Sequence, residues 1–359
     1  MSFASDRPFN GLPLIPPAIE KMQTAKIFKA CIAARAELAG LNMAGKLLPD
    51  QHILLSIIPM LEAKGSSGIE NIVTTNDRLF RFAEYDKHAD PATKEALRYR
   101  TAMYKGLSEL KTYPICMSVA SLICTTLRGV SSDVRKMSGT HLKDSAENII
   151  YTPPVGEAVI RDLLTNWETY INADVEVDEL VTMAIAHYQF ESIHPFEDGN
   201  GRTGRILNIL CLIDRGLLEQ PILYLSRYIL QHRDDYYTLL RGVTERGEWE
   251  PWILFIVKAV EETARWTTKK IEAIRKQIQE TRDYVKEQLP KEYTWELVDL
   301  LFRQPYCRIN TLVDAGILQR QAASTRLKQL TEIGVLEEAD SEGNNKVWVN
   351  TRLLRELDD

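Results

Sequence analysis

The sequence predicts a mainly α protein: a helical bundle that carries a short β-hairpin, followed by a smaller C-terminal domain. Three observations support this fold class. Apolar residues recur at helix spacing from about residue 19 to residue 127, and again from 155 to 288. Glycine, serine and proline interrupt that pattern between 129 and 154. Two short alternating segments follow the last predicted helix, as the strands of a hairpin would.

The bulk composition is ordinary for a soluble globular protein. The 359 residues can form two or three domains with sizeable cores, and the net charge of −6 argues against a protein that coats nucleic acid or membrane surfaces. The five cysteines are scattered without a C-x-x-C pair, which favours reduced core cysteines. No signal peptide or membrane-spanning run is apparent, so we expect a cytoplasmic protein with no membrane partner.

The N-terminal region begins with an extended segment and continues as helices. Residues 1–18 contain four prolines, which disfavour helix. Helical periodicity starts near Ile19 and runs to Leu38. A second amphipathic helix is predicted to start at Pro49 and to continue through Leu61.

The segment from His194 to Arg205 has the composition of a nucleotide site. It joins two predicted helices through a glycine-containing loop, and a helix N-terminus with free N–H groups binds anions. Arg202 and Arg205 lie three residues apart and can reach the same anion. Asp198 offers the hard oxygen that Mg²⁺ prefers. His194 can accept a proton near neutral pH.

These residues resemble the Fic family signature, H-x-F-x-D/E-G-N-G-R-x-x-R, at every defined position. The matching residues are His194, Phe196, Asp198, Gly199, Asn200, Gly201, Arg202 and Arg205. The resemblance implies a Fic-type helical bundle with a hairpin flap, and an adenylyltransferase that moves AMP from ATP to Ser, Thr or Tyr hydroxyls of target proteins and of itself. We accordingly divide the chain into an N-terminal region with an inhibitory motif (1–95), a catalytic domain (96–288) and a C-terminal domain (292–359).

The resemblance also implies roles for single residues. His194 would be the catalytic base and Asp198 the Mg²⁺ ligand, with Phe196 buried to anchor the loop. The expected nucleotide-binding residues are Glu70, His194, Gly199, Asn200, Gly201, Arg202, Thr203, Gly204, Arg205 and Tyr236. For Tyr236, a side chain that faces the core is the alternative. Glycine at 201 favours AMP transfer, because relatives that act as kinases carry lysine there.

Two interpretations compete for Gly65 to Asn71. Ser67 and Glu70 have the spacing of a capping box at a helix start. Ser66, Glu70 and Asn71 also fit S/T-x-x-x-E-G/N, the inhibitory motif of one Fic class. In that class the glutamate pairs with the second motif arginine, here Arg205, and takes the space of the ATP γ-phosphate. A carboxylate is a natural partner of arginine, and the two roles need not exclude each other.

The segment from Gly129 to Pro154 is predicted to contain a hairpin, with 139–142 turning back toward 148–151. In the Fic family a flap at this position lies over the active site and pairs with the target. Arg135 and the Tyr-x-Pro-Pro ending fit, whereas the hairpin sequence departs from the commoner pattern. An ordinary surface hairpin is the alternative.

The C-terminal part is predicted to be a solvated linking helix that ends near Gln288, followed by a winged helix-turn-helix. Helices are expected at 295–302, 309–315 and 322–333, and wing strands at 335–337 and 346–349 around Gly343 and Asn344. DNA binding would follow from that shape. However, from Glu292 onward eight Lys and Arg face twelve Asp and Glu, so docking to protein or homodimerisation is favoured over DNA.

Two other functions remain open. The same site could remove AMP from proteins, with Glu70 orienting water. Alternatively, the chain could be a transcriptional regulator whose Fic domain only senses ATP. The presence of His194 speaks against a mere sensor, which has no need of a base.

Overall fold

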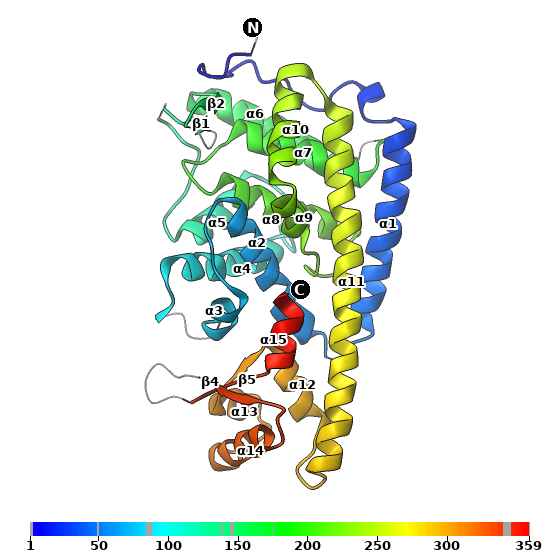
Figure 1. The fold of residues 1–359 in the computed structure, drawn as a ribbon. Coiled ribbons are helices and arrows are strands. Elements are labelled where there is room, and N and C mark those ends of the chain that lie inside the picture. Colours follow the sequence, from blue (N-terminus) through cyan, green and yellow to red (C-terminus); the bar gives the residue numbers. More distant parts are fainter. Residues whose placement is uncertain are drawn as a thin grey trace.

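The computed structural model describes residues 3–48, 50–83, 88–137, 139–143, 147–174, 176–339 and 346–358. It confirms the mainly α fold class, with two small antiparallel sheets (Figure 1). The predicted helix start at Pro49 and the wing turn at Gly343 and Asn344 lie outside the described residues.

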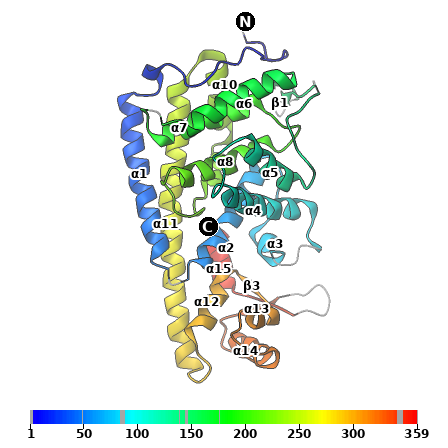
Figure 2. The same ribbon diagram turned by 180° about the vertical axis from the view of Figure 1, so that it is seen from behind.

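The N-terminal helices form one side of the bundle. They comprise a 3₁₀ turn (Ile19–Lys21), α1 (Ala25–Lys46), α2 (His52–Ile69) and α3 (Asn76–Arg81). Thr24 and Thr75 cap α1 and α3, because each side chain accepts a hydrogen bond from the backbone N–H three residues on. The inner face of α1 packs along α11, and both views show the two helices side by side (Figures 1 and 2).

The central helices surround a buried pair, α7 and α8. The elements are α4 (Pro91–Glu109), α5 (Met117–Arg128), β1 (Leu142–Lys143), β2 (Ile149–Tyr151), α6 (Glu157–Asn172), α7 (Glu179–Ile193), α8 (Asn200–Asp214), α9 (Leu225–Gln231), α10 (Arg233–Arg246) and α11 (Trp249–Gln288). From Leu180 onward every residue of α7 is buried, which fits a helix that is covered on all sides. The hairpin forms as predicted, with Leu142 opposite Tyr151.

In its described residues, the C-terminal part places four helices beside a three-stranded sheet of order β3-β5-β4. Its elements are α12 (Trp295–Arg303), β3 (Tyr306–Cys307), α13 (Ile309–Asp314), α14 (Arg320–Glu332), β4 (Glu337–Ala339), β5 (Val347–Val349) and α15 (Thr351–Asp358). The three predicted helices begin and end within two residues of the expected ranges. The sequence interpretation missed α15, although Asn350 caps it by accepting from the Leu353 N–H at 3.1 Å.

The second half of α11 is not the solvated linker that we expected. Ile271, Ile274, Ile278 and Val285 are at most 2% exposed. They are covered because α12 and α15 fold back onto this helix (Figure 1). The charged residues between them occupy the remaining faces, which is why the sequence of this segment looks polar. Helix α11 therefore packs against elements of both parts of the molecule along its whole length.

The interpretation of residues 65–71 as a helix start is also wrong. Ser66 and Ser67 lie in the last turn of α2, and Glu70 is its C-cap. Asn71 has a left-handed φ of 61°, the Ile72 N–H donates to Ser67 O, and the Asn71 N–H donates to Gly68 O. This pair of bonds is a Schellman motif, which favours Gly or Asn at the left-handed position. Helix termination thus explains the Asn that follows Glu70.

Candidate active site

The loop between α7 and α8 is fixed by hydrogen bonds from its own side chains and from Arg135, which lies in the segment before the flap. The Asn200 amide accepts from the Phe196 N–H at 2.8 Å and donates to Phe196 O at 2.9 Å. The Phe196 ring is completely buried, as predicted. Arg135 donates to His194 O at 2.8 Å and to Ile193 O at 3.3 Å. Asn200 therefore fixes the loop, and its amide is engaged with the backbone rather than free for a ligand.

The N-terminus of α8 offers an anion site in the predicted place. Gly199 precedes it with a left-handed φ of 84°, and the first-turn N–H groups have no acceptor within the helix. The positive end of the helix dipole adds to the attraction for an anion. The Asp198 carboxylate accepts from the Gly199 N–H at 2.6 Å. The helix start that was expected to bind phosphate therefore forms, with backbone N–H groups available to an anion.

Arg202 and Arg205 both lie in the first two turns of this helix. Arg205 is 1% exposed, and its guanidinium donates to Ser66 Oγ at 2.8 Å, to Ser66 O at 3.0 Å and to Glu70 Oε1 at 2.8 Å. Arg202 is 3% exposed and pairs with Glu95, and with Asp198 at 3.3 Å. No sequence pattern pointed to Glu95, which lies 107 positions before its partner.

The structure brings Glu70 and Ser66 to Arg205, 135 and 139 positions away in the chain. Burial by itself would raise the pKa of Glu70, but Arg205 and, more weakly, Arg202 hold the pKa below its usual value. The carboxylate is therefore ionised at neutral pH. It occupies the space beside Gly201, where an added Cβ would lie 2.3 Å from Glu70 Oε1. An anion of this chain thus lies at the anion site.

His194 ends α7 with a left-handed φ of 51° and ψ of 59°. Burial and the nearby Arg135 lower the pKa of His194 to about 4, against a partial opposing effect of Glu70. The imidazole is therefore neutral at pH 7 and able to take a proton. Its left-handed backbone turns the chain from α7 into the anion-binding loop, which places base and anion site next to each other.

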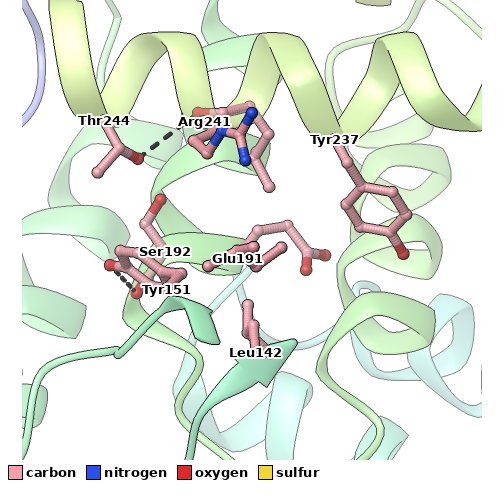
Figure 3. A pocket seen from close by; sticks show the side chains of 9 residues that line it. Leu142, Tyr151, Glu191, Ser192, Tyr237, Arg241 and Thr244 are labelled. Carbon is pink, nitrogen blue, oxygen red and sulfur yellow. Dashed lines mark hydrogen bonds between the residues drawn. The ribbon is translucent and has the colours of Figure 1, made fainter. Parts of the chain in front are cut away.

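A pocket lies beside this centre, between the flap and α10. It is lined by Leu142, Ile150, Tyr151, Glu191, Ser192, Tyr237, Leu240, Arg241 and Thr244. Figure 3 shows the Glu191 side chain pointing into the space between Leu142 and Tyr237. Burial raises the pKa of Glu191 to about 7, and its Oε1 has no hydrogen-bond partner among the described residues. Slots of this kind, mostly apolar with few polar groups, suit small-molecule ligands.

Tyr236, the expected base-stacking residue, lies in the core. It is 1% exposed, its hydroxyl lies 2.9 Å from His187 Nε2, and its ring packs against Trp252. The next residue, Tyr237, lines the pocket instead. Helical spacing alone could not distinguish two adjacent tyrosines. The lining residues Glu191, Arg241 and Thr244 were likewise not predicted, although Glu191 lies only three positions before His194.

The Asp198 side chain of the anion loop faces solvent, as does that of the neighbouring Glu197. The Asp198 side chain is 63% exposed and lies 3.6 Å from Arg128 Nε. The described residues contain no group of three or more His, Cys, Asp or Glu that could hold a metal by themselves. One accessible carboxylate fits an ion that takes its other ligands from phosphates and water, as Mg²⁺ commonly does. Thr203 and Gly204 are buried in the first turns of α8, and an added Cβ at Gly204 would lie 2.4 Å from Glu191 Oε1.

Three family models match the chain. Residues 28–108 match the Fic/DOC family N-terminal model, residues 121–212 the Fic/DOC family model, and residues 277–353 the C-terminal domain of SoFic-like protein adenylyltransferase. Within the described residues, no helix combines the length and the apolarity needed to cross a bilayer.

Curated relatives named protein adenylyltransferase Fic match part of the chain. The protein of Culex quinquefasciatus is 32% identical over 123 residues, which is 33% of this chain and 23% of the relative. That of Aedes aegypti is 30% identical over 149 residues, which is 40% of this chain and 28% of the relative. The chain thus covers about a quarter of the length of these relatives.

Solved structures match more of the chain at lower identity. A Fic family protein from Desulfovibrio desulfuricans G20 aligns with a TM-score of 0.59 and 18% identity, over 93% of this chain and 98% of the other. Residues 134–508 of Fic-1 from C. elegans align with a TM-score of 0.52 and 18% identity, over 69% of this chain and 74% of the other. At such identities the likeness concerns the fold alone.

Proposed function

The chain belongs to the Fic/DOC family, and we propose that it is a protein adenylyltransferase that is inhibited by its own Glu70. The reaction would move AMP from ATP to a Ser, Thr or Tyr hydroxyl of a target protein and of the chain itself, with release of diphosphate. The observation that carries the proposal is the pair between Glu70 and Arg205 at 2.8 Å, directly beside the α8 N-terminus. An anion site, a neutral base and an inhibitory carboxylate then share one centre.

The residues of the site would have the following roles in the reaction. The free N–H groups at the start of α8 stabilise negative charge on the phosphates. Arg202 and Arg205 orient the outer phosphates once Glu70 has left Arg205. His194, neutral at pH 7, accepts the proton of the target hydroxyl. Asp198 would hold Mg²⁺, which neutralises phosphate charge when it is bound.

The pocket between the flap and α10 would bind the nucleoside of ATP. Its mostly apolar lining and Tyr237 suit the faces of a base. The flap strand β2 contributes Tyr151, whose hydroxyl donates to Ser192 O at 2.8 Å and so ties the flap to the end of α7. An extended target segment could add to the hairpin edge through backbone hydrogen bonds.

The decisive experiment incubates this 359-residue chain and lysate proteins with ATP labelled at the α-phosphate. We expect weak labelling in the wild type, roughly ten- to a hundred-fold more in Glu70→Gly, and none in His194→Ala. The increase reflects the loss of a charged hydrogen bond of about 1.5–3 kcal/mol. If Glu70→Gly labels no better than wild type, the inhibitory role is wrong. Label from the γ-phosphate would contradict AMP transfer.

Removal of AMP is the second candidate, because Glu70 pairs with Arg205, lies near His194 and could orient a water there. It is tested by adding wild-type protein to targets that Glu70→Gly has labelled. Loss of label that requires both Glu70 and His194 would establish this direction.

A DNA-bound regulator is less favoured. Arg326, part of the basic stretch of the C-terminal domain, is bonded to Glu292 O and to Gln329, so it is not free for phosphate. Among the described residues of α14, only Arg320 and Lys328 remain as exposed cations. Specific retention of labelled DNA fragments by the full chain, lost in a Lys328→Ala variant, would argue for this alternative.

A further inference from the structure

Among the described residues, nothing pairs with Oε1 of the Glu191 carboxyl group, although the residue is only 8% exposed. His187 Nδ1 lies 4.0 Å away, which is too far for a hydrogen bond. Burial lowers the pKa of His187 to about 3, so its imidazole carries no charge that could pair with the carboxylate. Because an unpaired buried polar group costs free energy, its presence in this place calls for an explanation.

Two glycines of α8, about one turn apart, each lie against one carboxyl group. An added Cβ at Gly201 would lie 2.3 Å from Glu70 Oε1, and an added Cβ at Gly204 would lie 2.4 Å from Glu191 Oε1. Three residues of an α-helix advance by only about 4.5 Å, so the Glu191 carboxyl group lies close to the anion site at the start of α8. The charges of Arg205 and Glu70 both affect the pKa of Glu191, which agrees with this short distance. The anion site and the pocket are therefore neighbours along one helix.

Glu191 offers this pocket a hydrogen-bond acceptor, and Figure 3 shows its side chain pointing into the space between the flap and α10. Two hydroxyl groups of the lining are already engaged. Thr244 Oγ1 lies 2.9 Å from the Tyr188 hydroxyl, and the Tyr151 hydroxyl donates to a backbone oxygen at 2.8 Å. Burial raises the pKa of Glu191 to about 7, so neutral and ionised forms coexist near neutral pH, and an oxygen of either form can accept an N–H. A ligand that donates an N–H therefore fits this wall of the pocket.

We propose, on the basis of the adenylyltransferase function proposed above, that Glu191 determines the nucleobase specificity of the pocket by accepting a hydrogen bond from the exocyclic amino group of adenine. The apolar lining and Tyr237 contact the faces of the base, and Glu191 contacts its edge. In its neutral form the carboxyl group also donates to a ring nitrogen beside the amino group. A base without the amino group leaves the buried acceptor unpaired, and such a mismatch discriminates more strongly than a change in apolar contact.

The test compares the binding of ATP with that of purine riboside triphosphate, which lacks only the amino group of the base. Each nucleotide is titrated with Mg²⁺ into the 359-residue chain carrying Glu70→Gly, by calorimetry, so that the glutamate at the anion site does not affect the comparison. We expect ATP to bind at least about tenfold more tightly than the analogue. Adding Glu191→Leu should reduce this preference to within about twofold, because the acceptor for the amino group is gone.

Two further variants, both in the Glu70→Gly chain, separate hydrogen bonding from the shape of the pocket. Glu191→Gln keeps a carbonyl oxygen and should retain the preference for ATP. Arg241→Met is the matched control, because Arg241 lines the same pocket but has donors only. It should therefore keep the preference, even where both nucleotides bind less tightly. Thermal unfolding checks that each variant folds, and Glu191→Ala replaces Glu191→Leu if the leucine variant does not.

Three results would overturn the role of Glu191: equal affinities of the Glu70→Gly chain for the two nucleotides, a preference that survives Glu191→Leu, or a preference that Arg241→Met abolishes to the same extent. Each of these leaves the proposed adenylyltransferase function in place, because ATP still binds. If the Glu70→Gly chain binds neither nucleotide, the proposed function is contradicted together with the role of Glu191.

Discussion

At Gly201, a side chain of any size would meet the Glu70 carboxylate. An added Cβ would lie 2.3 Å from Glu70 Oε1 and 3.0 Å from an Arg205 nitrogen. The absence of a side chain thus makes room for Glu70 in this structure, and it would leave the same space for a phosphate in the proposed nucleotide complex.

We expect Gly201→Ala to cost about 1–3 kcal/mol of unfolding free energy in wild type, because the methyl group separates Glu70 from Arg205 and leaves a buried charge unpaired. In a Glu70→Gly background the carboxylate that the new methyl group would meet is absent. Gly201→Ala should therefore lower the unfolding free energy clearly less than it does in wild type. Denaturant unfolding of the four proteins in this double-mutant cycle measures the coupling. Additive costs would show that Glu70 does not fill this space.

Glu191 makes stability depend on pH. Its pKa is raised from 4.5 to about 7 by burial, so between these values the folded protein binds more protons than the unfolded chain. The unfolding free energy therefore falls as pH rises from 4.5 to 7, by up to about 3 kcal/mol at about 1.4 kcal/mol per pKa unit. Below and above this window the contribution no longer changes.

Glu191→Gln removes the titrating group while keeping the shape of the side chain. Relative to wild type, the variant should gain about 2.5 kcal/mol of unfolding free energy between about pH 5 and about pH 8, because only the part of the window above pH 5 contributes. Denaturant unfolding at both pH values measures the difference, with Glu332→Gln, outside the site, as control. Equal pH profiles for wild type and Glu191→Gln would mean that this carboxyl is not protonated in the folded state.

Among the elements, the end of α2 shows how helix termination positions Glu70. The Schellman motif places Asn71 in the left-handed region, and it fixes the Glu70 backbone as the chain leaves the helix. An S/T-x-x-x-E-G/N pattern is therefore a helix ending that presents a glutamate. The Asn71 side chain also accepts from Arg233 at 3.0 Å.

Asn71→Ala should cost about 1 kcal/mol of stability, because alanine is strained at positive φ, and should raise AMP labelling by displacing Glu70. Asn71→Gly is the matched control: it also loses the Arg233 contact but adopts the left-handed backbone freely. We expect it to label as weakly as wild type, in the same α-labelled ATP assay. Equal labelling by Ala and Gly variants would assign the effect to Arg233 instead.

Local patterns in the sequence predicted the helices, the hairpin and the motif loop, because caps, periodicity and turns are encoded within a few residues. They could not reveal contacts made by the fold. The burial of Ile274 and Ile278 depends on α15, a helix of 8 residues that follows much later in the chain. The Glu95 partner of Arg202, and the choice of Tyr237 over Tyr236, are likewise set by packing. Glu70 was predicted only through its family resemblance.

At the scale of the whole molecule, hydrogen bonds and an ion pair attach the C-terminal part to the N-terminal helices and to α11. Arg303 donates to Asp50 at 2.7 Å just before α2, Asn76 donates to Leu357 O at 2.7 Å, and Lys270 pairs with Glu356 at 3.0 Å. The same helix that ends at Glu70 therefore starts at a contact with α12. Both parts also share α11, whose 40 residues span about 60 Å.

The buried pair between Arg282 and Asp299 joins α11 to α12, with two contacts of 2.6 Å. Asp299→Ala leaves the arginine unpaired and should cost about 3 kcal/mol of unfolding free energy. Glu338→Ala, which breaks the exposed pair with Lys346, should cost no more than about 0.5 kcal/mol. Denaturant unfolding compares the two. If both variants lose similarly little unfolding free energy, the Arg282–Asp299 pair does not couple the two parts.

The end of α2 meets the start of α8, because the C-cap Glu70 lies beside Gly201 in the first turn. The negative end of one helix dipole therefore lies near the positive end of the other. The triphosphate of the proposed ATP substrate would meet the terminal carbonyls of α2 there as well as the glutamate side chain. Replacing Glu70 would remove only the second of these, which leaves an electrostatic barrier of up to about 1 kcal/mol to binding of that nucleotide.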